Sequence, residues 1–148
     1  MQKGIKTRLI SHRILFNIKI NSANFDEILE LYFSKYNLSI SDKKMVHNIV
    51  LSSMRFHFYV NKIISKFVKK KISSHQFILF LSAITQIVYL DFKDYAVVNS
   101  TVEITKNKNI IAHAGFTNAV LKNIVKNKTE LKKVTISFND LPSWFLKS

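Results

Sequence analysis

Few side chains in this sequence are suited to acid–base or metal chemistry, and they are scattered along it. The five histidines lack the spacing of metal ligands: they are His12, His47, His57, His75 and His113. Asp91 and Asp94 bracket a short polar stretch, but helix capping accounts for Asp94 without catalysis. No glycine-rich phosphate loop is present. The sequence therefore predicts that the isolated chain is not an enzyme and binds no metal or cofactor.

The composition is typical of one compact intracellular domain. Apolar residues make up 47% of the 148 residues, enough for a packed core. There is no cysteine, which excludes disulfides, cysteine-ligated zinc and a cysteine nucleophile. The longest apolar run, residues 77–90, is shorter than the roughly 20 residues that cross a bilayer. We expect a cytoplasmic protein without a membrane partner.

The net charge predicts a polyanionic binding partner. The net charge is +14, from 23 Lys+Arg against nine Asp+Glu, and both residues 1–25 and residues 104–129 lack acids. If the first helix and the last two share a face, their cations form one basic surface for an RNA backbone. The candidate phosphate contacts are Lys3, Lys6, Arg8 and Arg13, with Lys122 and Lys126 beside them. The alternatives are a merely solvated face and a lysine content raised by A/T-rich coding bias, and no DNA partner is expected.

Apolar residues recur at helical spacing almost throughout. They predict seven helices, at about residues 5–20, 25–36, 42–54, 55–68, 75–90, 94–106 and 110–126. The expected N-caps are Asn24, Ser41 or Asp42, Ser73 or Ser74, and Asp94. The second helix has an inward stripe formed by Phe25, Ile28, Leu29, Tyr32, Phe33 and Tyr36. The tail after residue 129 loses the helical period, and its segment "KVTISF" is compatible with an extended conformation.

A family resemblance lies in the stretch "YAVVNSTVEITKNKNIIAHAGFTNAVLKNIVK". It resembles the C-terminal signature of the NusB-like domain, a V-N-E-A-V-E-L-A-K segment followed by F-V-N-A-V-L-R. The matching positions are Val98, Asn99, Val102, Glu103, Lys106, Phe116, Asn118, Ala119, Val120 and Leu121. Ser100 replaces the usual glutamate, Thr117 the valine and Lys122 the arginine. The segments "SDKKMVHNIVLSSMRFHFYVNKII" and "FLSAITQIVYLD" also resemble the family.

The resemblance implies an all-α, NusB-like bundle of about seven helices in two three-helix subdomains. It implies an RNA-binding domain over residues 1–130, followed by a linker over residues 131–148. Gly115 would then let a neighbouring helix approach closely. Asn118 would point inward or along a groove, where it would bond to backbone or RNA.

Two branches of this family fit the sequence. The tail "LPSWFLKS" resembles the P-x-W-L linker of Sun/RsmB-type enzymes, so the first expectation is the N-terminal domain that recognises substrate in a 16S rRNA cytosine-5 methyltransferase. S-adenosylmethionine would then bind only to a missing catalytic domain. The alternative is a free-standing transcription antitermination factor that binds boxA RNA and a ribosomal protein. An apolar and acidic patch containing Asp26, Glu27 and Glu30 would serve that protein contact.

Overall fold

The computed structural model describes residues 3–134, with side chains for residues 4–133. Its regular elements are all helices joined by loops, which confirms the all-α prediction. It contains α1 (Lys3–Lys19), α2 (Phe25–Lys35), α3 (Ile40–Arg55), α4 (His57–Phe67), α5 (Ser74–Ile84), the π-helical segment η1 (Thr85–Tyr89), α6 (Asp94–Ile104), α7 (Ala114–Lys126) and α8 (Lys128–Val134).

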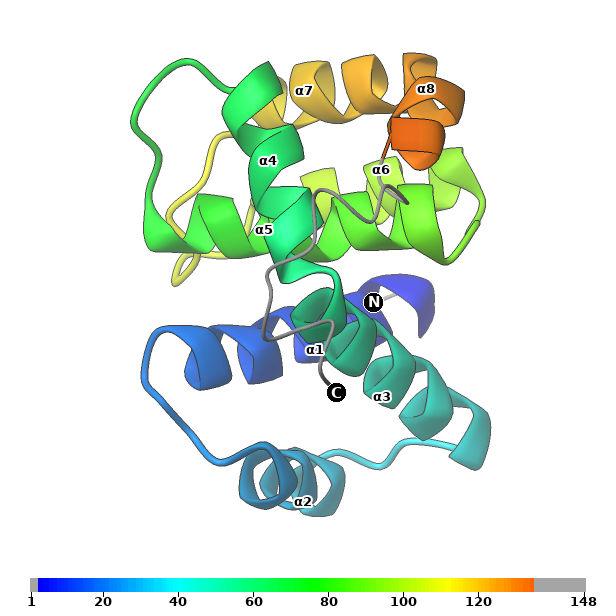
Figure 1. The fold of residues 1–148 in the computed structure, drawn as a ribbon. Helices are drawn as coiled ribbons and strands as arrows, with labels where there is room; N and C mark the ends of the chain where they lie inside the picture. The colour runs from blue at the N-terminus through cyan, green and yellow to red at the C-terminus, as the bar shows by residue number, and fades with distance from the viewer. Residues whose placement is uncertain (1–2, 135–148) are drawn as a thin grey trace.

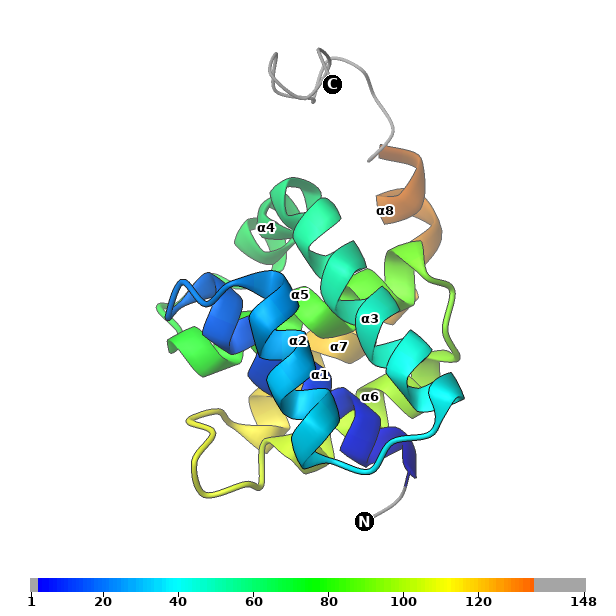
Figure 2. The same cartoon turned by 90° about the horizontal axis from the view of Figure 1, so that it is seen from below.

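The helices form two groups around a central layer. Helices α5 and α6 lie in the middle, with α1, α2 and α3 on one side and α4, α7 and α8 on the other (Figures 1 and 2). The reason lies in α5, whose residues 78–84 are all buried, as are residues 85–88 of η1. A helix that is apolar all round must be covered on every side. One continuous core cluster, which includes Ile14, Val46, Phe80 and Leu121, therefore runs through both groups.

Side-chain caps begin three helices. Asn24 Oδ1 accepts from the backbone N–H of Glu27 at 3.0 Å, and Ser73 Oγ accepts from that of Gln76 at 3.0 Å, as predicted. The third cap is Ser39 and not Ser41 or Asp42, because α3 begins earlier than its apolar pattern. Asp94 is also not a cap. It is the first residue of α6, and its carboxylate accepts from Lys128 Nζ at 3.1 Å.

The C-terminal prediction was wrong for residues 128–134, which form α8. Leu131 supplies the buried contact of this short helix, and Lys132 Nζ donates to Asp91 Oδ2 at 2.7 Å. The segment has only two apolar residues, Leu131 and Val134, which are too few to give a visible period. The boundary expected at residue 130 falls inside α8. The rest of the tail, with most of "KVTISF" and the linker-like "LPSWFLKS", lies outside the described residues.

Gly115 does not serve a close helix approach. It lies in the first turn of α7 with a negative φ, and a Cβ built on it would meet no atom within 4 Å. The close glycine is instead Gly4, where a Cβ would lie 3.1 Å from Arg8 Nη1. The expectation for Gly115 was therefore wrong, because the loop before α7 leaves this turn open to solvent.

The variant Gly115→Ala is expected to stabilise the fold by about 0.5–1 kcal/mol, since alanine lowers the entropy of the unfolded chain and fits the helix. Urea unfolding followed by circular dichroism measures the change. Gly4→Ala is the matched control and should gain less or lose stability. A destabilised Gly115→Ala variant would show that this position needs glycine.

Candidate nucleic-acid interface

The predicted basic residues differ in their accessibility. Lys122 and Lys126 are exposed, whereas Lys6, Arg13 and Asn118 are half-buried. Lys3 begins α1, but its side chain is outside the described part. Asn118 is not the residue that makes the buried hydrogen bond of this turn. That bond belongs to its neighbour Thr117, whose Oγ1 accepts from Gln76 Nε2 at 2.8 Å in the buried core.

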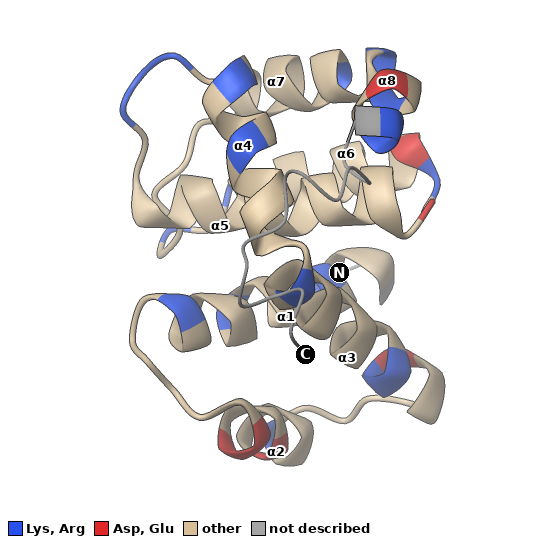
Figure 3. Cartoon of the chain, viewed as in Figure 1, with Lys and Arg blue, Asp and Glu red and all other residues tan. Residues whose placement is uncertain are grey.

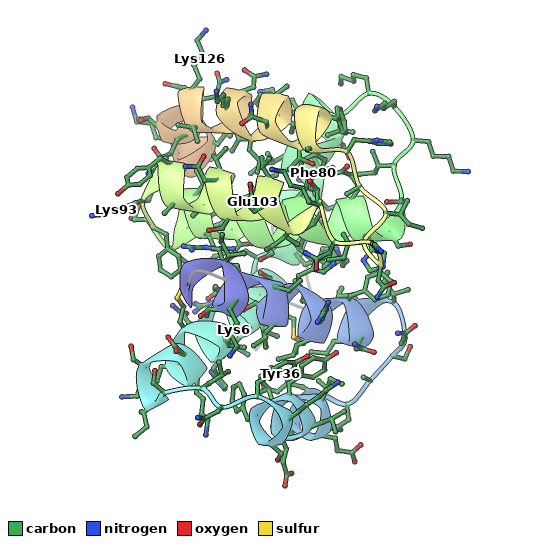
Figure 4. The ribbon with its side chains drawn as sticks, turned by 180° about the vertical axis from the view of Figure 1, so that it is seen from behind. Lys6, Tyr36, Phe80, Lys93, Glu103 and Lys126 are labelled. Atoms are coloured by element: carbon green, nitrogen blue, oxygen red, sulfur yellow. The ribbon has the colours of Figure 1, made fainter. Side chains whose placement is uncertain are left out.

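The cations of α1 and α7 do not form one track. Helices α5 and α6 lie between α1 and α7, and Lys6 and Lys126 lie far apart on opposite sides of that layer (Figure 4). The expectation of a shared face was therefore wrong for α7, because the central layer separates it from α1, whereas α6 does pack against α1. Because α5 and α6 need cover on both sides, the first and last helices of the bundle pack against opposite faces of them. Figure 3 shows lysines and arginines spread over both groups.

Arg8 is directed into the protein. It is 7% exposed, and its Nε donates to Gln86 Oε1 at 2.7 Å. Its Nη1 donates to Ser100 Oγ at 3.3 Å and to the carbonyl oxygen of Gly4 at 3.4 Å. Burial lowers the pKa of this guanidinium. These bonds join α1 to η1 and α6, so Arg8 is held inside the fold and the prediction that it contacts RNA phosphates was wrong.

A groove of about 410 Å³ lies between α1, α2 and the loop before α7. Its lining combines aromatic rings, amides and cations. The lining residues are Arg13, Phe16, Asn17, Asn21, Tyr32, Lys35, Tyr36, His75, Asn109 and Ile110. Of these, the sequence had indicated only Arg13 as a site residue.

The groove contains two pairs of stacked rings. Phe16 and His75 lie almost parallel, with an interplanar angle of 7° and centroids 4.0 Å apart. Tyr32 and Tyr36 stack at 5.9 Å, one helical turn apart, and Lys35 Nζ lies 5.6 Å from the centroid of Tyr36. The tyrosines had been predicted to belong to the buried stripe of α2. Ile28 and Leu29 of that stripe are buried, and its four aromatic residues are half-buried and pack against the core. The inward stripe is therefore confirmed in part, and Lys35 beside Tyr36 was the signal that the tyrosines also border a surface.

A neutral histidine pair supports the wall of the groove. His12 Nε2 and His75 Nδ1 are 3.0 Å apart, and His12 is 1% exposed. Burial, aided by the charges of His75 and Arg13, lowers the pKa of His12 to about 3. Burial also lowers the pKa of His75. His12 Nδ1 is buried and has no hydrogen-bond partner among the described residues. We infer that Nε2 carries the proton and donates a hydrogen bond to His75 Nδ1, since an unpaired lone pair costs less than an unpaired N–H.

This groove has the composition of a site for single-stranded nucleic acid. Flat rings offer stacking platforms to bases, amides offer hydrogen bonds to base edges, and Arg13 and Lys35 offer charge to phosphates. Within residues 3–134 no cluster of histidine and acidic side chains could hold a metal ion, and no helix is long and apolar enough to cross a membrane. The fold and the groove together define a helical, basic binding domain.

The chain belongs to the NusB family, whose profile matches residues 5–126. It is 29% identical over 135 residues to the transcription antitermination protein NusB of Buchnera aphidicola subsp. Cinara cedri (strain Cc), covering 88% of this chain and 95% of that protein.

Solved structures share the fold at lower identity. A chain in the crystal structure of antitermination factors NusB and NusE in complex with double-stranded RNA matches with a TM-score of 0.75 at 17% identity, over 85% of this chain and 98% of that chain. The NusB of T. maritima matches with a TM-score of 0.73 at 16% identity, over 90% of this chain and 98% of that one.

The methyltransferase interpretation is wrong. Residues 5–126 match the NusB family, and the alignment with the Buchnera protein runs along 95% of a NusB antitermination protein. The earlier preference depended on the "LPSWFLKS" tail, a short and weakly specific motif that lies outside the described residues. The alternative, a NusB-type factor, accounts for the chain better.

The buried histidine pair predicts acid sensitivity. The pKa of His12 falls from 6.5 in the unfolded chain to about 3 in the fold, so the neutral side chain stabilises the fold above pH 6.5. That stability is lost as the pH falls toward 3, at roughly 1.4 kcal/mol per unit. The variant His12→Gln should show a shallower decline in unfolding free energy between pH 6.5 and pH 4. If the unfolding free energies of both proteins decline in parallel, His12 does not cause the acid sensitivity.

Proposed function

We propose that the chain is a transcription antitermination factor that binds single-stranded RNA of the boxA type together with a ribosomal protein, and is not an enzyme. The observation that carries the proposal is the groove between α1 and α2, where stacked rings, amides and cations meet on one surface. The Buchnera relative bears the name of such a factor, and NusB and NusE appear with RNA in a structure of the same fold.

The rings would hold bases and the cations would hold the backbone. Tyr36 and Phe16 each have one partner ring already in place, so a base would extend an existing stack. Arg13 lines the groove, and Lys6 lies earlier on the same helix. We propose Arg13, Lys35, Lys6 and Lys3 as phosphate contacts. Asn118, Lys122 and Lys126 belong to α7, across the central layer, and are not assigned to this RNA.

Salt dependence tests the cations. Each phosphate contact on single-stranded RNA contributes ~0.7 to the slope of log K against log salt. The variant Arg13→Gln should weaken binding to a boxA-type oligonucleotide and flatten that slope by about 0.7. The double variant Lys122→Gln/Lys126→Gln removes two charges from the other face and should leave the slope unchanged. The reverse pattern would place the RNA on α7.

Ring removal tests stacking independently of charge. Tyr36→Leu keeps an apolar side chain at the end of α2 but removes the ring. It should weaken RNA binding by about 1–3 kcal/mol and leave the slope of log K against log salt unchanged. Fluorescence anisotropy with labelled RNA measures both quantities. Tyr95→Leu is the matched control, since Tyr95 is 66% exposed on α6, away from this groove. Equal losses for the two variants would contradict the assignment.

The outer face of α2 suits a basic ribosomal protein. Asp26, Glu27 and Glu30 are all exposed there beside Leu31, which is 58% exposed (Figure 3). On a chain of net charge +14, a basic partner is repelled over most of the surface. This acidic and apolar face is therefore the surface we propose for the protein partner.

Charge reversal separates the two partners. The variant Glu30→Lys/Leu31→Asp should reduce capture of the ribosomal protein tenfold or more and leave RNA affinity within about twofold, because neither side chain lines the groove. Titration of each partner separately by anisotropy or calorimetry provides the measurement. Unchanged protein capture would exclude this face of α2.

A further inference from the structure

Arg8 is a buried cation without an acidic partner. All three of its recorded acceptors are neutral: the Gln86 amide, the Ser100 hydroxyl and the Gly4 carbonyl. No aspartate or glutamate among residues 4–133 forms an ion pair with it. A buried charge costs free energy unless it is paired. A guanidinium with only neutral acceptors therefore retains the ability to bind an anion.

An open groove reaches this guanidinium. It has a volume of about 460 Å³ and lies between the start of α1 and the outer side of α6. Arg8, Gly4 and Ser100 line its inner part, and Tyr95, Asn99 and Glu103 line its rim. Gly4 keeps the inner part accessible, since a Cβ there would lie 3.1 Å from Arg8 Nη1. This groove is separate from the one proposed for RNA, and the two share no lining residue.

The groove holds a serine beside the guanidinium and no acid that pairs with it among the described residues. Ser100 occupies the position where the NusB-like pattern carries a glutamate, and its hydroxyl accepts from Arg8 Nη1 at 3.3 Å. A glutamate at this position would place a carboxylate beside the guanidinium. Glu103, the one acid that lines the groove within the described residues, is bonded to Lys106 Nζ at 2.8 Å. The site thus keeps the cation and lacks its counterion.

We propose that the α1–α6 groove binds a carboxylate group from another molecule, with Arg8 as its charged partner. Nε and Nη1 of Arg8 already donate within the protein, so Nη2 is the nitrogen that would donate to a carboxylate oxygen. The exposed amide of Asn99 and the exposed ring of Tyr95 would contact the atoms that carry it. A nucleic-acid backbone fits less well, because its neighbouring phosphates would pass along the rim that holds Glu103. The carboxylate comes either from a free organic acid or from an acidic side chain of a peptide.

The Nε–Hε signal of Arg8 reports binding directly. The chain has three arginines, and Arg8 Nε is held in a buried bond to Gln86, so its NMR signal should be resolved and slow to exchange. Titration with acetate, with a blocked Gly-Gly-Asp-Gly-Gly peptide and with dimethyl phosphate compares the ligand classes. Acetate should give a saturable shift with half-saturation on the order of 1 mM. Tighter binding of the peptide identifies a protein segment as the source, and equal binding identifies a free acid.

The variant Ser100→Glu tests the site without weakening the fold. Its carboxylate should occupy the position of the ligand, raise the thermal midpoint and reduce the carboxylate response at least tenfold. Ser34→Glu adds the same charge on exposed α2 and should leave the response unchanged. A response retained in Ser100→Glu, no response in the parent chain, or tighter binding of dimethyl phosphate would each overturn the proposal. None of these results depends on the RNA site.

Discussion

The burial of α5 on all sides is the constraint on which the rest of the structure depends. Its apolar surface, from Ile78 to Val88 across the π-helical continuation, needs helices on both faces. Two buried glutamines connect this central segment to the two groups. Gln76, at its start, donates to Thr117 and accepts from the backbone N–H of His113, which fixes the beginning of α7. Gln86, near its end, accepts from Arg8, which fixes α1. These contacts fix where α1 and α7 lie, and so decide which side chains meet on the surface.

The same constraint distributes the charge. Cations of α1 and α7 end on opposite faces, and those near the end of the bundle are partly neutralised, since Lys128 and Lys132 pair with Asp91 and Asp94. The high net charge therefore gives general attraction to a polyanion over the whole surface. We place the RNA site in the α1–α2 groove because paired rings and amides lie there beside the cations.

The sequence predicts the architecture well and the site poorly. Helical periods and caps such as Asn24 and Ser73 are local, and local signals survive folding. The burial of Arg8 cannot be predicted from its neighbours in the sequence, since its partners Gln86 and Ser100 are 78 and 92 residues away. Tyr32 and Tyr36 also appear as core residues in a one-dimensional pattern, because an aromatic ring suits both a core and a stacking surface. Helix α8 could not be predicted because Leu131 is its one buried residue among those whose side chains are described, and one residue gives no period.

Photo-crosslinking of bromouridine-substituted single-stranded RNA to the full chain, followed by peptide mapping, tests the central claim most directly. The account predicts crosslinks to the aromatic residues of α1 and α2, at Phe16, Tyr32 or Tyr36. Crosslinks confined to α7, or to Tyr95 on α6, would contradict it.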